Sequence, residues 1–128
     1  MSDKFTLEII TPNKSILKSE ASEVTIPSYE GQMGILKDHI PLITFLRPGI
    51  ISLQDQEKKY YVEEGTIEFS NNNLLILTST AKDIKDLNQS YVEDLLNQAK
   101  NKLSDVNSSD KEKYLLSYKI STLKEINQ

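Results

Sequence analysis

The sequence predicts a mainly β protein, in which an N-terminal antiparallel β-sandwich is followed by a C-terminal hairpin of two antiparallel helices. Three observations support this fold class. Up to about Leu87 the apolar residues alternate with polar ones or occur in short bursts, and turn-forming residues separate these bursts. After Leu87 the apolar residues recur every three or four positions. Alternating or clustered apolar residues between turns are typical of many short strands. Apolar residues that recur every three or four positions are typical of amphipathic helices.

The expected strands follow one another closely along the first two thirds of the chain. Apolar residues alternate with polar ones at Phe5, Leu7 and Ile9, and again at Val24 and Ile26. Further apolar bursts lie at residues 50–53, 60–62, 66–69 and 74–77. The turns between the strands are marked by Pro12-Asn13, Gly31, Gly34, Pro48-Gly49 and the asparagine run at 71–73. We expect the asparagine run to form a hairpin turn, and the strands to form an antiparallel sandwich or barrel.

The first helix is predicted from a stripe of apolar residues spaced three or four apart. The stripe consists of Val92, Leu95, Leu96, Ala99 and Leu103. Asn88 and Ser90 are both possible N-caps, and Ser90 with Glu93 fits the spacing of a capping box.

A second helix is predicted after a polar break at residues 104–109, where Ser109 and Glu112 fit a capping box. Its apolar face is Leu116, Ile120 and Leu123, flanked by Leu115, Tyr118 and Ile126. We therefore expect a β-sandwich domain at residues 1–86 and a helical hairpin domain at residues 87–128. Roughly five apolar side chains per helix, at about 1.5–3 kcal/mol each, do not offset the backbone entropy of ordering roughly forty residues. The hairpin must therefore dock on the sandwich or on another protein.

Composition excludes several classes of function. The formal charge of −4 and a pI of about 5.0 argue against nucleic-acid binding. The chain has no cysteine and one histidine, so neither a thiol nucleophile nor a His/Cys metal site is expected. No apolar run approaches the roughly 20 residues that span a bilayer, and no signal peptide is recognisable. We therefore expect no direct membrane insertion.

No catalytic constellation is apparent either. His39 has Asp38 beside it but no cysteine or motif-placed serine, so we expect it to have a structural role. Glu63 and Glu64 are adjacent, and on a strand they would point to opposite faces instead of pairing. Neither GxxxxGK[ST] nor GxGxxG occurs. We expect no catalytic residue, no metal and no cofactor.

Residues 30–51 hold three of the four glycines, two prolines and the single histidine. The spacing Glu30-Gly31-x-x-Gly34-Ile35-x-x-x-His39-x-Pro41-Leu42, followed by Pro48-Gly49, resembles the epsilon subunit of F-type ATP synthases, the counterpart of the mitochondrial delta subunit. The later run Glu64-Gly65-x-Ile67-Glu68-x-x-x-Asn72-x-x-Leu75-Ile76-x-x-x-x-Ala81 resembles the same family. So does the N-terminal phrase Phe5-x-Leu7-x-Ile9-Ile10-Thr11-Pro12.

The resemblance implies a sandwich of about ten short strands and a non-catalytic role. Such a subunit belongs to the central stalk, or rotor, where it binds the gamma subunit and the c-ring and couples ion translocation to ATP synthesis. His39 would then be an interface residue or would brace its loop. The expected contacts with gamma and the c-ring are Gly31, Met33, Gly34, Ile35, His39, Pro41 and Leu42.

The resemblance also raises the question of regulation by the hairpin. In many relatives the hairpin extends along gamma and blocks ATP hydrolysis, with basic residues of the second helix meeting the beta subunit. The corresponding residues here are Lys111, Lys113, Lys119 and Lys124. Because lysine lacks the bidentate fork of arginine, we expect any inhibition to be modest or absent.

Some relatives bind ATP through the motif [Ile/Leu]-Asp-x-x-Arg-Ala at the start of the first helix. In this chain the acid is replaced by Asn88, the arginine by Tyr91 and the alanine by Val92. Tyrosine cannot supply the charge that a phosphate partner needs, so we expect no useful ATP affinity.

The resemblance implies a peripheral location on the cytoplasmic face of the bacterial inner membrane. Mitochondrial counterparts normally begin with a transit peptide, whereas the first strand here is expected by Phe5, so we expect a bacterial source, with a plastid-encoded one as the alternative. A different functional class is a β-sandwich module that binds carbohydrate or peptide and dimerises through a helical tail. The absence of tryptophan and an aromatic content of 7% argue against that class. A cupin-like or lectin-like enzyme would need metal-ligating histidines.

Overall fold

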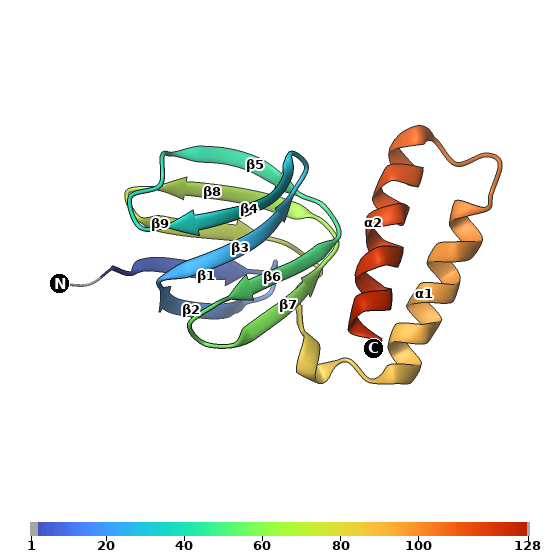
Figure 1. Ribbon diagram of the computed structural model, residues 1–128, viewed down its shortest axis with the longest axis horizontal. Coiled ribbons are helices and arrows are strands. Elements are labelled where there is room, and N and C mark those ends of the chain that lie inside the picture. Colours follow the sequence, from blue (N-terminus) through green and yellow to red (C-terminus); the bar gives the residue numbers. More distant parts are fainter. Residues whose placement is uncertain (1–2, 128) are drawn as a thin grey trace.

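The computed structural model describes residues 3–127, and in this range ten strands precede a pair of α-helices (Figure 1). The strands are β1 (Phe5–Ile10), β2 (Ser15–Ala21), β3 (Glu23–Ser28), β4 (Gly31–Leu36), β5 (Leu42–Leu46), β6 (Gly49–Leu53), β7 (Lys58–Val62), β8 (Gly65–Ser70), β9 (Asn73–Leu77) and β10 (Lys82–Asp83). A 3₁₀ turn, η1 (Ile84–Asp86), leads to α1 (Gln89–Leu103) and α2 (Asp110–Ile126). The mainly β fold with a C-terminal helical pair is confirmed.

The strands form one curled sheet in the order β10-β7-β6-β3-β5-β8-β9-β1-β2, with β4 paired to β3. The pairs are antiparallel except for β1 and β9, which run parallel. The expectation of a purely antiparallel sheet is therefore wrong at this seam. Parallel neighbours need a long crossover, and the long stretch of chain between β1 and β9 supplies it.

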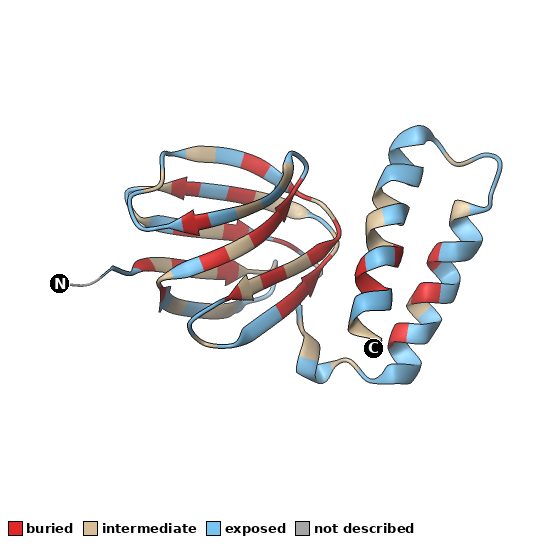
Figure 2. Cartoon of the chain, viewed as in Figure 1, coloured by how far each residue is buried: buried red, intermediate tan, exposed pale blue. Residues whose placement is uncertain are grey.

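The predicted alternation places the expected residues in the sheet core. Phe5, Leu7 and Ile9 are buried, and so are Val24 and Ile26 (Figure 2). Because successive strand residues point to opposite faces, these side chains line the core while their neighbours along β1 and β3 point away from it.

The asparagine run forms the hairpin turn between β8 and β9, as predicted. Asn71 and Asn72 have φ angles of 50° and 58°. Two consecutive left-handed residues give a turn whose twist matches that of the flanking strands, and asparagine tolerates this conformation better than most residues.

The two helices begin at polar caps. The side chain of Ser109 accepts a hydrogen bond from the Glu112 backbone N–H, and the Glu112 carboxylate accepts one from Ser109, so the predicted capping box is present. At α1 the N-cap is Asn88, which accepts from the Tyr91 N–H at 2.8 Å. Ser90 lies inside the helix, so the alternative cap at Ser90 is wrong.

The hairpin docks on the end of the sheet, and α2 lies between the sheet and α1 (Figure 1). Both predicted apolar stripes face a second core that includes one strand residue, Tyr61 of β7. Its buried members are Tyr61, Val92, Leu96, Ala99, Ile120 and Leu123. The change from sheet to helices falls at η1, beside the expected boundary at residues 86 and 87. Whether the two parts fold as separate domains stays a prediction.

Candidate functional site

The segment from Gly31 to Leu42 is half strand, so the expectation that Gly34 marks a turn is wrong. Gly31 to Leu36 form β4, which pairs with β3 in antiparallel register. Only residues 37–41 form a connection, which turns the chain into β5. Asp38 occupies the left-handed region at φ 66°, which makes the turn tight.

Two side-chain interactions hold this corner against the β8–β9 turn. Asp38 and Asn72 are joined twice: the Asp38 N–H donates to Asn72 Oδ1 at 2.7 Å, and Asn72 Nδ2 donates to Asp38 Oδ1 at 3.0 Å. The His39 ring stands edge-on to Phe69, with 5.9 Å between centroids, and its Nδ1 lies 2.7 Å from the carbonyl oxygen of Ile40. His39 therefore braces the corner.

The predicted interface residues do not share one environment. Ile35 is fully buried, so its side chain packs in the sheet core and is not presented to a partner. Gly34 and Pro41 are exposed, whereas Gly31, Met33, His39 and Leu42 are half-buried. Next to them stand two strongly exposed apolar side chains that the sequence did not single out, Leu36 and Ile40.

A larger apolar surface lies on the side of β5, β8 and β9 that faces away from the core. Strand register aligns six side chains on it in two rows. The rows are Ile43, Glu68 and Leu75, and Phe45, Thr66 and Leu77. We call these six residues the outer face. Ile43 is 78% exposed and Phe45 is 59% exposed.

The β5 strand is inverted with respect to the usual pattern, because its polar residue points inward. Thr44 is buried between the exposed Ile43 and Phe45, and its hydroxyl donates to Glu30 Oε2 at 2.7 Å. This hydrogen bond, reinforced by one from Ser28, lowers the pKa of Glu30. A buried threonine is thereby satisfied, and two large apolar side chains remain on the surface.

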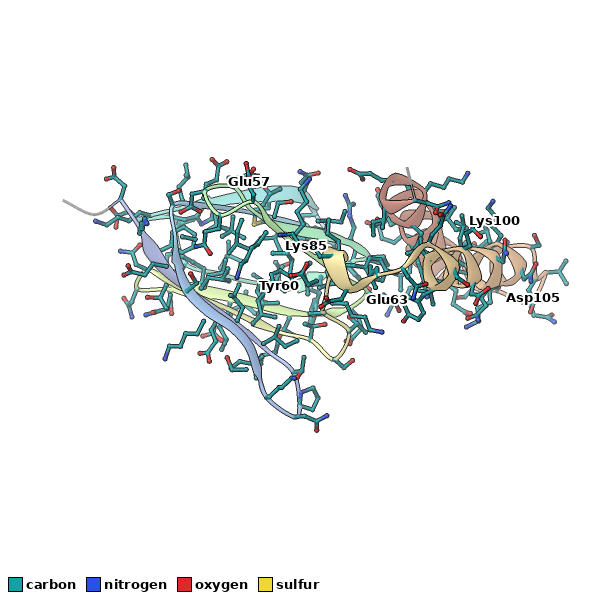
Figure 3. All side chains as sticks on the ribbon, turned by 90° about the horizontal axis from the view of Figure 1, so that it is seen from below. Glu57, Tyr60, Glu63, Lys85, Lys100 and Asp105 are labelled. Carbon is teal, nitrogen blue, oxygen red and sulfur yellow. The ribbon has the colours of Figure 1, made fainter. Side chains whose placement is uncertain are left out.

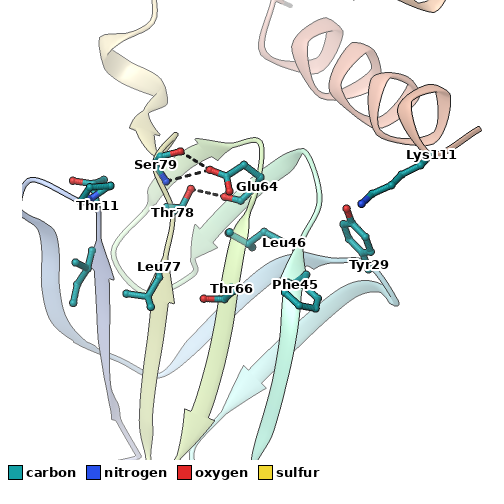
Figure 4. Close-up of a pocket in the computed structure, with 13 residues that line it drawn as sticks. Thr11, Tyr29, Phe45, Leu46, Glu64, Thr66, Leu77, Thr78, Ser79 and Lys111 are labelled. Atoms are coloured by element: carbon teal, nitrogen blue, oxygen red, sulfur yellow. Dashed lines mark hydrogen bonds between the residues drawn. The ribbon is translucent and has the colours of Figure 1, made fainter. Parts of the chain in front are cut away.

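One end of the outer face opens into a groove of about 660 Å³ between the sheet and the start of α2 (Figure 4). Its walls include Phe45 and Leu77 from the sheet, Tyr29 from the β3–β4 turn, Glu64 from the β7–β8 turn and Lys111 from α2. Figure 4 shows Lys111 extending from the helix toward Tyr29. The groove is therefore mostly apolar and has a cation on one rim.

The hairpin is joined to the sheet by an ion pair and by a stacked cation. Lys119 Nζ lies 3.1 Å from Glu63 Oε2, and Glu63 also accepts the Tyr61 hydroxyl at 2.9 Å. Figure 3 shows Glu63 at the junction of the two parts. The guanidinium of Arg47, at the β5–β6 turn, lies 3.8 Å above the ring of Tyr118. Since Glu63 and Glu64 both follow the end of β7, their expected placement on a strand is wrong.

The four lysines of α2 therefore differ in environment. Lys119 takes part in the junction with the sheet, whereas Lys111, Lys113 and Lys124 are exposed. The two kinds of lysine would not be equally available to another subunit.

The residues that replace the ATP motif all have structural roles. Asn88 caps α1, and Val92 is buried in the second core. Lys82 Nζ donates to the Tyr91 hydroxyl at 2.8 Å and lies 4.5 Å from the centroid of that ring. Tyr91 thus contacts the sheet through Lys82 of β10.

Two searches of residues 3–127 bear on other kinds of site. No group of three or more His, Asp or Glu side chains is arranged to hold a metal ion among these residues. Within the same range, neither helix has the length and apolar character needed to cross a bilayer.

Comparison with known proteins gives the class of the chain. Residues 4–84 match the family described as ATP synthase, Delta/Epsilon chain, beta-sandwich domain. Since this match covers more than half of the sequence, the chain belongs to the delta/epsilon chain family of ATP synthases.

Individual relatives agree with this class. An ATP synthase epsilon chain of Pelagibacter ubique (strain HTCC1062) is 47% identical over 130 residues, which cover 99% of this chain and 100% of the relative. A mitochondrial ATP synthase subunit delta of Schizosaccharomyces pombe is 35% identical, over 84% of this chain and 66% of its own. The similarity to the bacterial relative thus includes the helical hairpin.

Solved structures show the same fold. A chain in the mitochondrial ATP synthase of Euglena gracilis (OSCP/F1/c-ring) superposes with a TM-score of 0.82, at 18% identity, over 100% of this chain and 84% of its own. A chain in the central stalk and c-ring of the Tetrahymena thermophila enzyme gives a TM-score of 0.64, at 13% identity, over 96% of each chain. These neighbours establish that the curled sheet with two helices recurs in ATP synthases.

Proposed function

We propose that the chain is a non-catalytic subunit of the central stalk of an F-type ATP synthase. It binds the gamma subunit and the c-ring, and so couples ion translocation to ATP synthesis. It is held peripherally at the cytoplasmic face of the bacterial inner membrane through these partners. The proposal is supported by membership in the delta/epsilon chain family and by similarity over the full length to an epsilon chain.

The observation that carries the proposal is the outer face. Exposing Ile43 and Phe45 on the same side of β5 does not stabilise the chain by itself. Contiguous exposed apolar surface is typical of a binding site for another protein. Because the rows run over three hydrogen-bonded strands, the surface is rigid and ready for a partner. We assign this face to gamma.

The corner at residues 37–41 extends the proposed surface. Ile40 and Leu36 are strongly exposed there, while the Asp38–Asn72 pair fixes the backbone that carries them. A corner of this kind can present apolar side chains to the c-ring or gamma without a large loss of entropy on binding.

The test is the affinity of the full-length chain for purified gamma subunit. Ile43→Asp places a charge at the most exposed apolar side chain of the outer face, and we expect it to weaken binding by at least tenfold. Val106→Asp is the matched control, because Val106 is 90% exposed but lies in the loop between the helices. Equal affinity of the two variants would show that the outer face is not the gamma site.

We also propose that the chain has no useful affinity for ATP. At the positions of the ATP motif, Asn88 caps α1, Val92 is buried in the second core, and Tyr91 contacts Lys82. Titration calorimetry of ATP into the full-length chain should show no binding in the micromolar range. A saturable heat with micromolar affinity would contradict this proposal.

A further inference from the structure

Glu68 is the charged residue of the outer face, and it lies between two apolar residues of its row. On β8 it is paired with Ile43 of β5 on one side and with Leu75 of β9 on the other. Glu68 is exposed, and Ile43 beside it is 78% exposed. Among residues 3–127, the Glu68 carboxylate takes part in neither a hydrogen bond nor an ion pair. A partner that covers the outer face must therefore also cover a free carboxylate.

Glu8, further along the same row, has a different environment. It lies next to Leu75 on β1, and Lys18 of β2 lies opposite it in register. Its carboxylate also accepts the Ser15 hydroxyl at 3.0 Å. Cross-strand pairs of opposite charge stabilise a sheet, so the charge of Glu8 contributes within the chain. The strand residues paired with Glu68 provide neither a cation nor a hydroxyl.

A shallow hollow of about 360 Å³ lies beside Glu68. Its lining comes from residues 41–43 and from β8, and consists of Pro41, Leu42, Ile43, Glu68, Phe69 and Ser70. The walls are held in place by the two interactions of the corner, which are the His39 ring on Phe69 and the Asp38–Asn72 pair. The hollow thus has room for a long side chain whose tip reaches the Glu68 carboxylate.

The charge of Glu68 determines what kind of side chain can bind there. Covering an ionised carboxylate removes its hydration, which is costly unless a cation or hydrogen-bond donors replace the water. Arginine and lysine combine an apolar stem with a cationic tip, so the stem can pack on Ile43 while the tip reaches the carboxylate. An apolar side chain would leave the cost in place, and an acidic one would increase it. The hollow therefore favours a basic residue.

We propose that the gamma segment on the outer face carries a basic side chain, arginine or lysine, which binds in this hollow and pairs with Glu68. This inference rests on the proposed function and adds the chemistry of the partner segment to it. The residues that flank the basic one are expected to be apolar, because they cover the exposed Phe45 and Leu77 of the neighbouring row. The apolar contacts supply affinity, and the charge pair fixes the position of the segment on the sheet.

The experiment measures the affinity of full-length variants for purified gamma subunit. Glu68→Gln keeps the size of the side chain and removes its charge, and we expect it to weaken binding by about fivefold or more. Glu68→Lys places a cation against a cation and should weaken binding further than Glu68→Gln. If no cation of gamma met Glu68, removal of the unpaired carboxylate would instead strengthen binding. The direction of the change therefore distinguishes the two cases.

Glu93→Gln is the matched control. Glu93 is exposed on α1, and its carboxylate accepts from Gln89 Nε2 of the same helix at 3.4 Å. The control makes the same change of charge away from the outer face, so its affinity for gamma should stay within about twofold of the parent. An equal loss in Glu93→Gln and Glu68→Gln would assign the effect to net charge and overturn the proposal.

A salt series gives a second measurement. Because salt screens an ion pair at an interface, the affinity of the parent should fall more steeply than that of Glu68→Gln between about 0.05 M and about 0.5 M NaCl. Equal slopes would mean that the Glu68 carboxylate meets no cation of gamma.

The outcomes separate this inference from the proposed function. Failure of gamma to bind the parent, or equal affinity of Ile43→Asp and Val106→Asp, would overturn both. Equal or tighter binding of Glu68→Gln, with Ile43→Asp still weakened, would overturn the basic side chain and leave the stalk role standing. The expected result is weaker binding of Glu68→Gln with a flatter salt dependence, and an unchanged Glu93→Gln.

Discussion

At the scale of single residues, Gly65 and Gly34 differ in whether the backbone would tolerate a side chain. Gly65 has a φ of 147°, and a Cβ built there would overlap the backbone carbonyl of Leu77. Gly34 has ordinary backbone angles, and the nearest atom to an added Cβ is Glu23 Oε2 at 3.9 Å. Both glycines belong to the spacing that first indicated the family, but only Gly65 is required by the backbone.

We therefore predict that Gly65→Ala lowers the free energy of unfolding by at least about 2 kcal/mol, from backbone strain and overlap together. Gly34→Ala should change it by no more than about 1 kcal/mol, and with either sign. Urea denaturation of the two variants measures the difference. Similar midpoints would contradict this account of the turn into β8.

Tyr61 gives a prediction about pH. Burial, and then the nearby Glu63 carboxylate, raise the pKa of the Tyr61 hydroxyl well above its ordinary value of 10.0. Above pH 10 the unfolded chain therefore releases this proton while the folded chain keeps it, and the folded state loses stability as pH rises.

Tyr61→Phe removes the loss of stability at high pH that comes from the Tyr61 hydroxyl. At pH 7 the variant should be less stable by about 0.5–1.5 kcal/mol, because the hydrogen bond to Glu63 is lost. The deficit should shrink between pH 9 and 11, since phenylalanine has no proton to lose; the remaining tyrosines are common to both proteins. Denaturation midpoints measured across this range provide the test, and a constant deficit would contradict the burial argument.

At the scale of elements, the hairpin depends on its caps. Ser109 and Glu112 satisfy backbone donors at the start of α2, and this could be predicted from their spacing alone. We predict that Ser109→Ala destabilises α2 by about 1 kcal/mol, seen as faster amide exchange in its first two turns.

Ser117→Ala is the matched control for that change. Ser117 lies in the exposed middle of α2 and bonds only to the Lys113 carbonyl oxygen of its own helix. Alanine has the higher helix propensity, so this variant should be neutral or slightly more stable. If both serine variants exchanged at the same rate, the box would not determine where α2 begins.

The strand β5 shows what sequence reasoning could have found and did not. In residues 42–46 the only polar side chain is Thr44, which suggests a strand buried on both faces. The structure instead buries Thr44 against Glu30 and exposes Ile43 and Phe45. A single threonine within an apolar strand was the available signal for the outer face.

At the scale of the whole molecule, local patterns predicted the elements but not their long-range closure. The parallel pairing of β1 with β9 joins two strands that are far apart in the chain and whose sequences carry no sign of pairing direction. The docking of α2 rests on Tyr61, Glu63 and Arg47, each distant in sequence from the helix. Short-range periodicity fixes which face of a helix is apolar, but it does not identify what covers that face.

The docked hairpin leads to a prediction about regulation. Lys119 is held by Glu63, so fewer cations remain available to meet the beta subunit than the sequence suggests. We predict that removal of residues 88–128 changes ATP hydrolysis by the assembled enzyme less than twofold. A steady-state ATPase assay on membranes that carry the full or truncated chain measures this, and a several-fold rise on truncation would contradict it.

Purification of the tagged chain from its host membranes is the most direct test of whether it works as a stalk subunit. We expect the alpha, beta and gamma subunits to be recovered together with ATP-hydrolysing activity. Ile43→Asp should lose these partners, and Val106→Asp should retain them. Recovery of the chain alone, or with unrelated proteins, would contradict the stalk role.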